Sequence, residues 1–152
     1  MRVWRITQRK YALDRLGAGS ALYGGRWNPV GLSALYCGAS IAICALEKFV
    51  HIGSAPLPPL VLVAVDLPNQ SSIFFPTASE LPSGWDELPT SVSEQTLGRG
   101  WIERGDTLAM RVPSAVLPEE CNVILNPRHP DFEHVELTVV RPFSFDQCMF
   151  KQ

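Results

Sequence analysis

The chain has 152 residues, of which 13 are Lys or Arg and 15 are Asp or Glu, so its formal net charge is −2. This length suits one domain, and the composition, 46% hydrophobic and only 18% charged, is too apolar for a disordered chain. A slightly acidic protein also lacks the basic field of a general nucleic-acid binder. No apolar run approaches the roughly 20 residues that cross a bilayer, no signal peptide is visible, and the four cysteines form no CxxC pair. We therefore expect a cytoplasmic protein with reduced thiols.

The net charge hides an asymmetry between the two ends of the chain. Residues 1–51 carry seven basic and two acidic side chains, whereas residues 52–152 carry six basic and 13 acidic ones. These counts correspond to balances of +5 and −7. Either the two parts attract each other inside one domain, or the basic part binds an anionic ligand.

The first half of the chain predicts two strands and one helix. Residues 3–7 alternate between apolar and polar types, and residues 32–37 form a second strand that ends at Gly38. Ser40 is a good N-cap for a helix over residues 41–50. That run is apolar nearly all round, so we expect the helix to be largely buried.

The second half predicts a strand-rich region. A β-branched run over residues 60–67 fits a core strand, and residues 76–89 read as an acidic surface excursion. A helix over residues 93–104 is weakened by Gly98 and Gly100. Further strands are expected at residues 71–75, 108–112, 122–125 and 135–140. The chain is thus predicted to be one α+β domain over residues 1–152, with a mixed or mostly antiparallel sheet and a buried helix near residues 40–52.

The densest group of candidate binding residues runs from Gly24 to Gly31. Gly24 and Gly25 precede Arg26, so backbone N–H groups and a guanidinium could converge on one anion. Trp27 beside them offers a flat surface for a base or ring. A hairpin turn with a surface arginine explains the segment equally well, and neither the P-loop nor the GxGxxG spacing is present.

Tyr36 and Glu47 are the next candidates. A tyrosine at a strand end is usually a core residue. Glu47 lies inside the apolar helix, where a carboxylate either faces a cleft or pairs with a basic group such as Arg26. Both alternatives remain open at this point.

The second half offers weaker catalytic patterns. Ser114 follows a predicted strand and Pro113, which can hold the hydroxyl at the edge of a cleft. A hydrolase triad of Ser114, His129 and Asp131 lacks the GxSxG elbow. His129 and Asp131, with nearby His134 and Glu133, have no spacing that would converge them on a metal, so we expect none.

Taken together, these segments resemble the RES-domain toxins of bacterial type II toxin–antitoxin systems, named for Arg, Glu and Ser. The resemblance extends over about residues 5–142, and its order and spacing carry it more than any single motif does. The matching segments are Gly25-Arg26-Trp27-Asn28, Leu35-Tyr36, Leu46-Glu47, Arg111-Val112-Pro113-Ser114-Ala115-Val116, and residues 122–131.

The resemblance implies a fold like that of the diphtheria-type ADP-ribosyltransferases, with NAD as the substrate and no metal. Such proteins degrade NAD or transfer its ADP-ribose to a target protein. It also implies an Xre-like helix-turn-helix antitoxin that covers the active site, and a toxin dimer within a larger complex. No direct contact with nucleic acid or a membrane is expected.

The resemblance also implies roles for individual residues. Glu47 would stabilise the positive charge that develops on the ribose, and Tyr36 would stack on the nicotinamide or the ribose. Arg26, helped by the Gly24–Gly25 backbone and Arg5, would hold the pyrophosphate, and Ser114 would hydrogen-bond the ribose or the amide. The remaining residues expected to bind NAD are Trp27, Asn28 and Asn122.

Two other functions compete with this expectation. A non-catalytic module that binds a nucleotide or a peptide at residues 24–31 would explain the basic first part without turnover. A nuclease toxin is disfavoured by the acidic net charge and by the lack of a basic stripe with interleaved aromatic residues.

Overall fold

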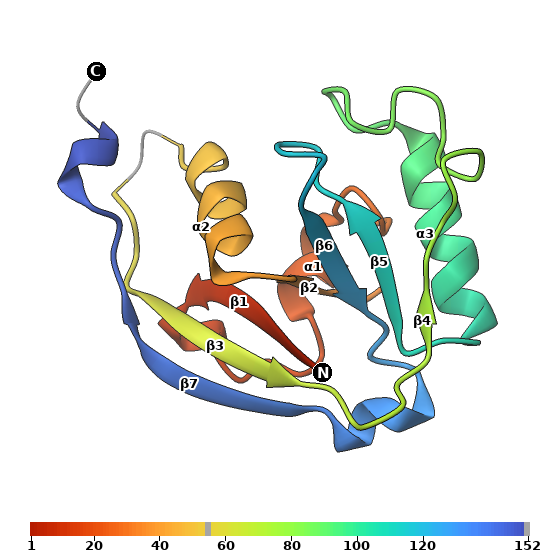
Figure 1. The fold of residues 1–152 in the computed structure, drawn as a ribbon, viewed down its shortest axis with the longest axis horizontal. Helices are drawn as coiled ribbons and strands as arrows, with labels where there is room; N and C mark the ends of the chain where they lie inside the picture. The colour runs from red at the N-terminus through yellow and green to blue at the C-terminus, as the bar shows by residue number, and fades with distance from the viewer. Residues whose placement is uncertain (54–55, 151–152) are drawn as a thin grey trace.

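The strands form one sheet in a computed structural model that describes residues 1–53 and 56–150. Across these residues the sheet has seven strands, in the order β4-β5-β6-β2-β1-β3-β7 (Figure 1). Their bounds are β1 (Arg2–Gln8), β2 (Leu35–Gly38), β3 (Leu60–Asp66), β4 (Ile73–Phe74), β5 (Ala109–Pro113), β6 (Cys121–Leu125) and β7 (Glu136–Phe143). Neighbouring strands are antiparallel except β4 and β5, which are parallel. The predicted α+β class with a mixed sheet is confirmed.

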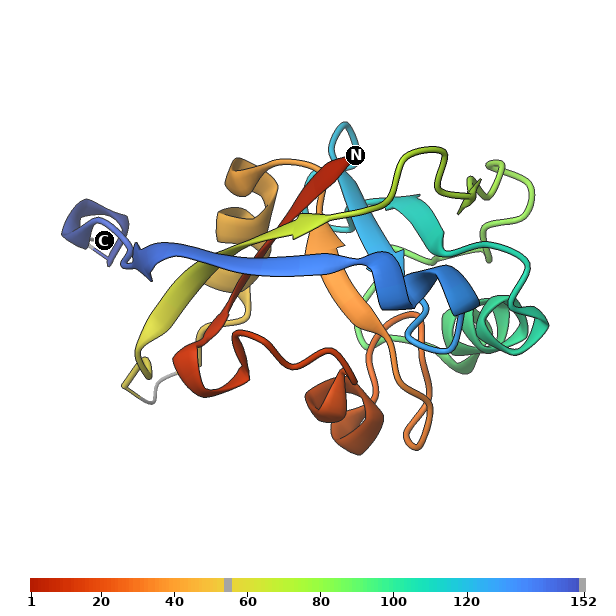
Figure 2. The same ribbon diagram turned by 90° about the horizontal axis from the view of Figure 1, so that it is seen from below.

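Three α-helices and three short 3-10 helices accompany the sheet in the described residues. They are α1 (Ala18–Tyr23), α2 (Ile41–Val50), α3 (Val92–Arg104), η1 (Arg9–Tyr11), η2 (Pro130–His134) and η3 (Gln147–Phe150). Helix α2 packs on β1 and β2 in the middle of the sheet, whereas α3 lies beside β4 and β5 at one end (Figures 1 and 2). No helix of the described part is both long and apolar enough to cross a membrane.

Alternation along β3 divides the core between the two faces of the sheet. Val61, Val63 and Val65 pack into the largest cluster of buried residues, whereas Leu60 and Leu62 face the other way and pack with Cys44 of α2. A continuous apolar strand is therefore buried on both sides, as its composition predicted. At the other end of the sheet, α3 packs through Trp101 and Ile102 onto β5 and β6.

Helix α2 begins as predicted but is less buried than predicted. The Ser40 hydroxyl accepts a hydrogen bond from the Ile43 backbone N–H at 3.2 Å, so Ser40 is the N-cap. Only Ile43 and Cys44 are buried among the ten residues of the helix. The expectation of a largely buried helix is thus wrong, because α2 covers the sheet with one side and leaves the others half-buried or exposed.

The sheet changes character where β1 meets β2. These two strands pair at Trp4 and Gly38, whereas β1 pairs with β3 along seven residues. A Cβ atom on Gly38 would lie 2.7 Å from Cys44 Sγ and from Ile43 Cγ2, so only glycine lets α2 approach β2 this closely. The residues around this junction line the cavity described next.

Strand β7 lies at one edge of the sheet. Its register with β3 shifts between Leu62 and Val63, which indicates a β-bulge, and Pro142 lies opposite Val61. Beyond β7, Phe145 and Phe150 contact Phe49 with ring centroids 5.7 and 5.5 Å apart. These aromatic contacts attach the last described helix, η3, to the carboxyl end of α2.

Candidate functional site

A cavity of about 320 Å³ lies where β1, β2 and β6 meet α2. Its walls combine aromatic, cationic and acidic side chains from segments far apart in the sequence. The polar and aromatic side chains among its lining are Trp4, Arg5, Thr7, Tyr36, Glu47, Lys48, His51 and Asn122. It is therefore the cavity in which the predicted Tyr36, Glu47, Arg5 and Asn122 come together.

The carboxylate of Glu47 is held firmly through one oxygen. Its Oε1 accepts a hydrogen bond from the Ser114 hydroxyl at 2.7 Å and another from the Asn122 side-chain amide at 2.6 Å. No hydrogen bond to Oε2 is found within the described residues, and this oxygen lies 4.0 Å from His51 Nδ1. Of the two alternatives for Glu47, the structure has the cleft rather than a pair with Arg26.

Ser114 is placed to orient Glu47 rather than to touch a ligand. The residue has no exposed surface, and its Oγ accepts hydrogen bonds from the backbone N–H groups of Val116 and Leu117 at 3.0 and 3.2 Å. With both acceptor positions used, the hydroxyl proton is directed at Glu47. The turn after β5 therefore fixes the rotamer of a carboxylate on α2, 67 residues away in the chain.

Tyr36 lines the cavity, and its hydroxyl is bound by the Gly25–Asn28 turn. The hydroxyl donates to Asn28 Oδ1 at 2.7 Å and accepts from the Trp27 backbone N–H at 3.0 Å. Burial raises the pKa of Tyr36 well above its usual value, so the phenol is neutral at physiological pH. The ring is thus a fixed, uncharged wall.

Two cations, Arg5 and Lys48, face this cavity, and within the described residues neither forms a salt bridge. Arg5 donates to the Tyr11 carbonyl at 3.3 Å, and burial lowers its pKa. The pKa of Lys48 is lowered by burial and by the charge of Arg5. Mutual repulsion of this kind is relieved by an anion, which makes this wall suited to a phosphate or pyrophosphate group.

Arg26 lies outside the lining of this cavity. Its Nη1 donates to the backbone carbonyl of Trp85 at 2.5 Å and to that of Glu87 at 3.1 Å. The same nitrogen is 3.8 Å from Glu94 Oε1, and the exposed fractions of the two side chains are 17% and 1%. The structure thus engages the guanidinium with protein groups rather than with the space beside Glu47.

The neighbours of Arg26 support Tyr36 from behind. Trp27 is 2% exposed and stacks on Trp85 at 6.3 Å, so it offers no free ring face to a base. Asn28 is fully buried and its amide donates to the carbonyls of Ser20 and Leu32. Neither Trp27 nor Asn28 is among the residues that line the cavity beside Glu47.

The turn itself has the hairpin character that the sequence allowed. Gly25 and Asn28 form an isolated antiparallel bridge, with a hydrogen bond from Gly25 N–H to the Asn28 carbonyl of 2.9 Å. A Cβ atom on Gly25 would lie 2.6 Å from the Tyr36 hydroxyl oxygen. Gly25 therefore leaves the room that the tyrosine hydroxyl needs.

Among the polar and aromatic lining residues, sequence reasoning missed Trp4, Thr7, Lys48 and His51. Lys48 and His51 follow Glu47 on or just after the same helix, at spacings of one and four residues, so the helical period offered a signal for His51. Trp4 and Arg5 are neighbours on β1, and both line the cavity. Nothing in the local sequence distinguishes Trp4 from a core tryptophan.

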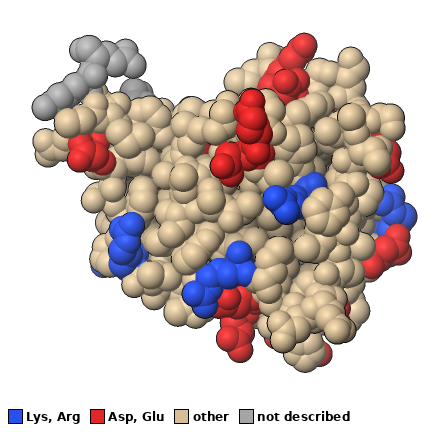
Figure 3. All heavy atoms as spheres, viewed as in Figure 1, with Lys and Arg blue, Asp and Glu red and all other residues tan. Residues whose placement is uncertain are grey.

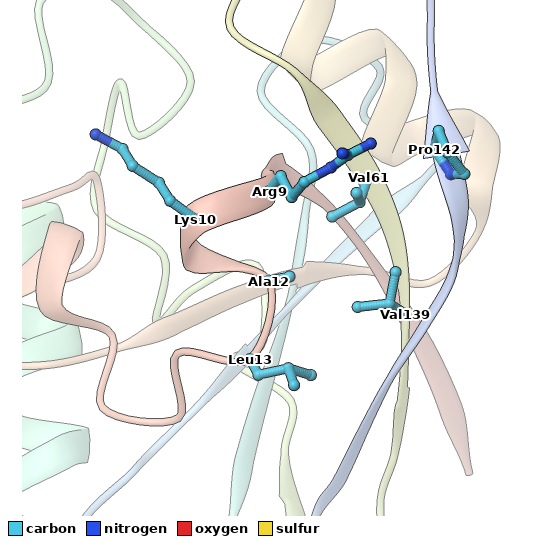
Figure 4. A pocket seen from close by; sticks show the side chains of 7 residues that line it. All are labelled: Arg9, Lys10, Ala12, Leu13, Val61, Val139 and Pro142. Atoms are coloured by element: carbon cyan, nitrogen blue, oxygen red, sulfur yellow. The ribbon is translucent and has the colours of Figure 1, made fainter.

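A second cavity, of about 450 Å³, opens beside η1, β3 and β7 (Figure 4). Val61 lines it and points away from α2, so this cavity lies on the other face of β3 from Glu47. Arg9 and Lys10 bring charge to an otherwise apolar lining, which includes no carboxylate, tyrosine or histidine. The larger cavity therefore lacks a carboxylate and a tyrosine like those that line the cavity beside Glu47.

The weaker patterns of the second half do not assemble. His129 Nδ1 accepts a hydrogen bond from the Asp131 backbone N–H within η2, while Ser114 is bound to Glu47. Within residues 1–53 and 56–150, no group of three or more His, Cys, Asp or Glu is placed to hold a metal ion. On the face shown in Figure 3, charged side chains lie in small groups of both signs rather than in one basic patch.

The chain is similar to known toxins over nearly its whole length. The chain is 37% identical over 155 residues to the Prs ADP-ribosylating toxin of Sphingobium sp. (strain YBL2), covering 98% of this chain and 96% of the relative. It is 35% identical over 147 residues to Toxin Res of Yersinia enterocolitica, covering 95% of each chain. These relatives define the class of the protein as a toxin. Residues 2–146 match the RES domain, so the chain belongs to the RES domain family, and the resemblance seen in the sequence is confirmed.

A solved structure gives the same picture of the fold. The crystal structure of the M. tuberculosis MbcT–MbcA toxin–antitoxin complex contains a chain that superposes with a TM-score of 0.71 at 17% identity. The match covers 98% of this chain and 86% of that one. At this identity the comparison establishes a shared fold over nearly the whole chain.

Proposed function

We propose that this protein is the toxin of a toxin–antitoxin pair and that it cleaves NAD at the bond between nicotinamide and ribose. One observation carries the proposal: a carboxylate fixed through Oε1 by Ser114 and Asn122 faces a cavity that also holds Tyr36 and two cations. The product is ADP-ribose, either free or attached to a target protein. The name of the Sphingobium relative, an ADP-ribosylating toxin, supports this reaction class.

The proposed reaction needs an ionised carboxylate to stabilise positive charge, and it does not need a general acid to protonate the leaving group. Breaking the C1′–N bond leaves the electron pair on nicotinamide, which departs neutral, and an oxocarbenium-like charge develops on the ribose. Glu47 Oε2 is the oxygen available to hydrogen-bond a ribose hydroxyl and stabilise this charge. An acceptor hydroxyl then bonds to C1′ and loses its proton. Water as the acceptor gives hydrolysis, and a protein side chain gives transfer.

The other cavity residues bind and orient the dinucleotide in this proposal. Arg5 and Lys48 hold the pyrophosphate, and the Tyr36 ring packs against the nicotinamide or the ribose. Asn122 both orients Glu47 and lines the cavity. Arg26, predicted from the sequence as the pyrophosphate ligand, acts here through the turn that supports Tyr36.

The partners follow from the same family. We propose that residues 1–152 form one domain of the diphtheria ADP-ribosyltransferase type, acting in the cytoplasm as a dimer within a larger complex. An Xre-like antitoxin would cover the cavity, and the toxin–antitoxin title of the structural relative supports an antitoxin partner. Large apolar side chains on the surface, such as Leu88 and Val92 at 80% and 78% exposed, offer contact area to such a partner.

Nicotinamide release by the purified protein tests the proposal. We expect turnover of NAD by the unaltered chain and a loss of about a hundredfold or more in Glu47→Gln, which keeps the shape but not the charge. Glu133→Gln, at a carboxylate exposed on η2, is the matched control and should retain full activity. Mass spectrometry with and without a bacterial lysate distinguishes free ADP-ribose from a modified protein.

Two results would refute this function. The first is equal nicotinamide release by the unaltered chain and by Glu47→Gln. The second is saturable binding of NAD with no nicotinamide formed over hours, which would instead establish the non-catalytic binding module.

A further inference from the structure

The most unusual polar group outside the cavity is the side chain of Glu94 in the first turn of α3. It is 1% exposed, and its Oε1 is the buried side-chain N or O atom without a hydrogen-bond partner in the described part of the chain. Its Oε2 accepts hydrogen bonds from the hydroxyls of Ser91 and Ser93. A buried carboxylate oxygen left without a partner is unfavourable, so something else must account for its position.

Capping of α3 explains the position of Glu94 Oε2 but not the burial of Oε1. Ser91 is the N-cap and Glu94 stands three residues later, the spacing of a capping box. The cap uses Oε2, however, and an exposed glutamate would cap equally well. Oε1 points instead toward Arg26 Nη1, 3.8 Å away, and this cation is the compensating charge for the buried carboxylate.

Arg26 connects three segments at this point. It belongs to the turn before β2 and binds the carbonyls of Trp85 and Glu87 in the loop between β4 and α3. It also faces Glu94 on α3. Two further contacts press α3 onto the same turn. The Gln95 side-chain amide donates to the Gly25 carbonyl at 3.0 Å, and a Cβ atom on Gly98 would lie only 1.7 Å from the Trp27 carbonyl oxygen.

The turn that α3 holds is the one that holds Tyr36. The Trp27 backbone N–H donates to the Tyr36 hydroxyl, which in turn donates to Asn28 Oδ1. A displacement of the turn therefore moves the tyrosine ring that lines the cavity. The chain of contacts runs from Glu94 through Arg26 and the turn to Tyr36.

We infer that Glu94 is a positioning residue for the reaction: it fixes Arg26 and the Gly25–Asn28 turn, and through them the ring of Tyr36. This inference rests on the proposed function for its kinetic consequence but not for its structural one. It accounts for a buried charge that capping leaves unexplained. It also gives the family's arginine a role that does not require contact with NAD.

Glu94→Gln is the variant that tests the inference, because it keeps the size and the hydrogen bonds of Glu94 but removes the charge that faces Arg26. We expect the turnover number for NAD to fall about tenfold to a hundredfold, as for a misplaced site group, with a smaller change in KM. Glu103→Gln, on the same helix at an exposed carboxylate paired with Arg99, is the control and should leave turnover unchanged. In a Tyr36→Phe background, Glu94→Gln should add little, since both changes act on one ring.

Amide hydrogen exchange at Trp27 gives a readout that does not depend on NAD. In Glu94→Gln the protection of the Trp27 N–H should fall about tenfold or more, while amides of β3 keep their protection. Arg26→Lys should produce the same loss and serves if Glu94→Gln does not fold. Unchanged protection at Trp27 together with unchanged turnover would overturn the inference. If the unaltered chain releases no nicotinamide, the proposed function fails, and the exchange experiment still decides the role of Glu94.

Discussion

At the scale of single residues, the cavity that holds Glu47 also carries two cations, Arg5 and Lys48, that repel each other. Lys48 carries a pKa lowered by burial and by Arg5, so it loses its proton at a lower pH than an ordinary lysine. A bound pyrophosphate favours the protonated form, and affinity for NAD should therefore weaken as the pH rises through the pKa of Lys48.

Lys48→Met and Lys48→Arg separate charge from packing at this position. Lys48→Met should raise the KM for NAD about tenfold near neutral pH by removing one charge-assisted contact. Lys48→Arg should keep the KM low and remove its rise at alkaline pH, because arginine stays protonated. Initial rates between pH 7 and pH 10 measure both effects. A KM unchanged by Lys48→Met would place the pyrophosphate elsewhere.

Residue types and spacing predicted some residues of this site, but not which of them line the cavity and which support it from behind. Glu47 was recognisable because a carboxylate within an apolar helix is unfavourable unless it faces a cleft or pairs with a cation. Arg26 and Trp27, predicted as direct ligands, do not line the cavity that holds Glu47, and a Gly-Gly-Arg-Trp turn looks the same in the sequence whether its side chains face a cavity or the body of the protein. Trp27 stacks on Trp85 and Arg26 faces Glu94, and both partners lie far along the chain. No local sequence pattern connects either pair.

At the scale of elements, α3 illustrates how tertiary contact overrides helix propensity. Gly98 and Gly100 lower the propensity of this segment, yet both lie inside a 13-residue helix. At Gly98 the missing Cβ lets the helix backbone touch the backbone of Trp27, whereas at Gly100 a Cβ would lie 3.4 Å from the end of the Arg104 side chain. One glycine is thus required by packing and the other is not.

Alanine at each of these glycines should have opposite effects on stability. Gly98→Ala should lower the free energy of unfolding by about 3 kcal/mol or more, because a Cβ there forces α3 away from the turn. Gly100→Ala should raise it by about 0.5–1 kcal/mol through helix propensity. Urea denaturation followed by tryptophan fluorescence measures both. Equal effects of the two variants would contradict the close approach of α3 to Trp27.

The strands were easier to predict than the helices around them. Runs such as β3 are set by β-branched composition and a terminating proline, which are local features. Helix α1 was missed because it is short, contains Gly19 and has Gly17 as an N-cap without a side-chain hydrogen bond. It forms where the Ser20 hydroxyl donates to the Ala34 carbonyl at 2.6 Å, a contact across 14 residues that the local sequence does not encode.

At the scale of the whole molecule, buried thiols link stability to pH. Burial raises the pKa of Cys37 and that of Cys44 to about 12, from an ordinary value near 9. The folded state keeps these protons while the unfolded state loses them, so the stabilisation is full below about pH 9 and is lost as the pH rises toward about 12.

Chemical denaturation over an alkaline pH series tests this linkage. Between about pH 9 and pH 11, each thiol should lower the free energy of unfolding by roughly 1.4 kcal/mol per pH unit. Cys37→Ala with Cys44→Ala should flatten that slope, whereas Cys148→Ala, at an exposed cysteine, should not. An equal slope in all three proteins would show that the two thiols do not control the alkaline limit.

The loop that receives Arg26 presents backbone carbonyls rather than side chains. Every amino acid carries the same carbonyl, so Glu87 can be exchanged over generations without breaking the contact. An insertion or deletion within the loop would instead move both acceptors together. Substitutions in this loop should therefore be tolerated better than insertions or deletions that change its length.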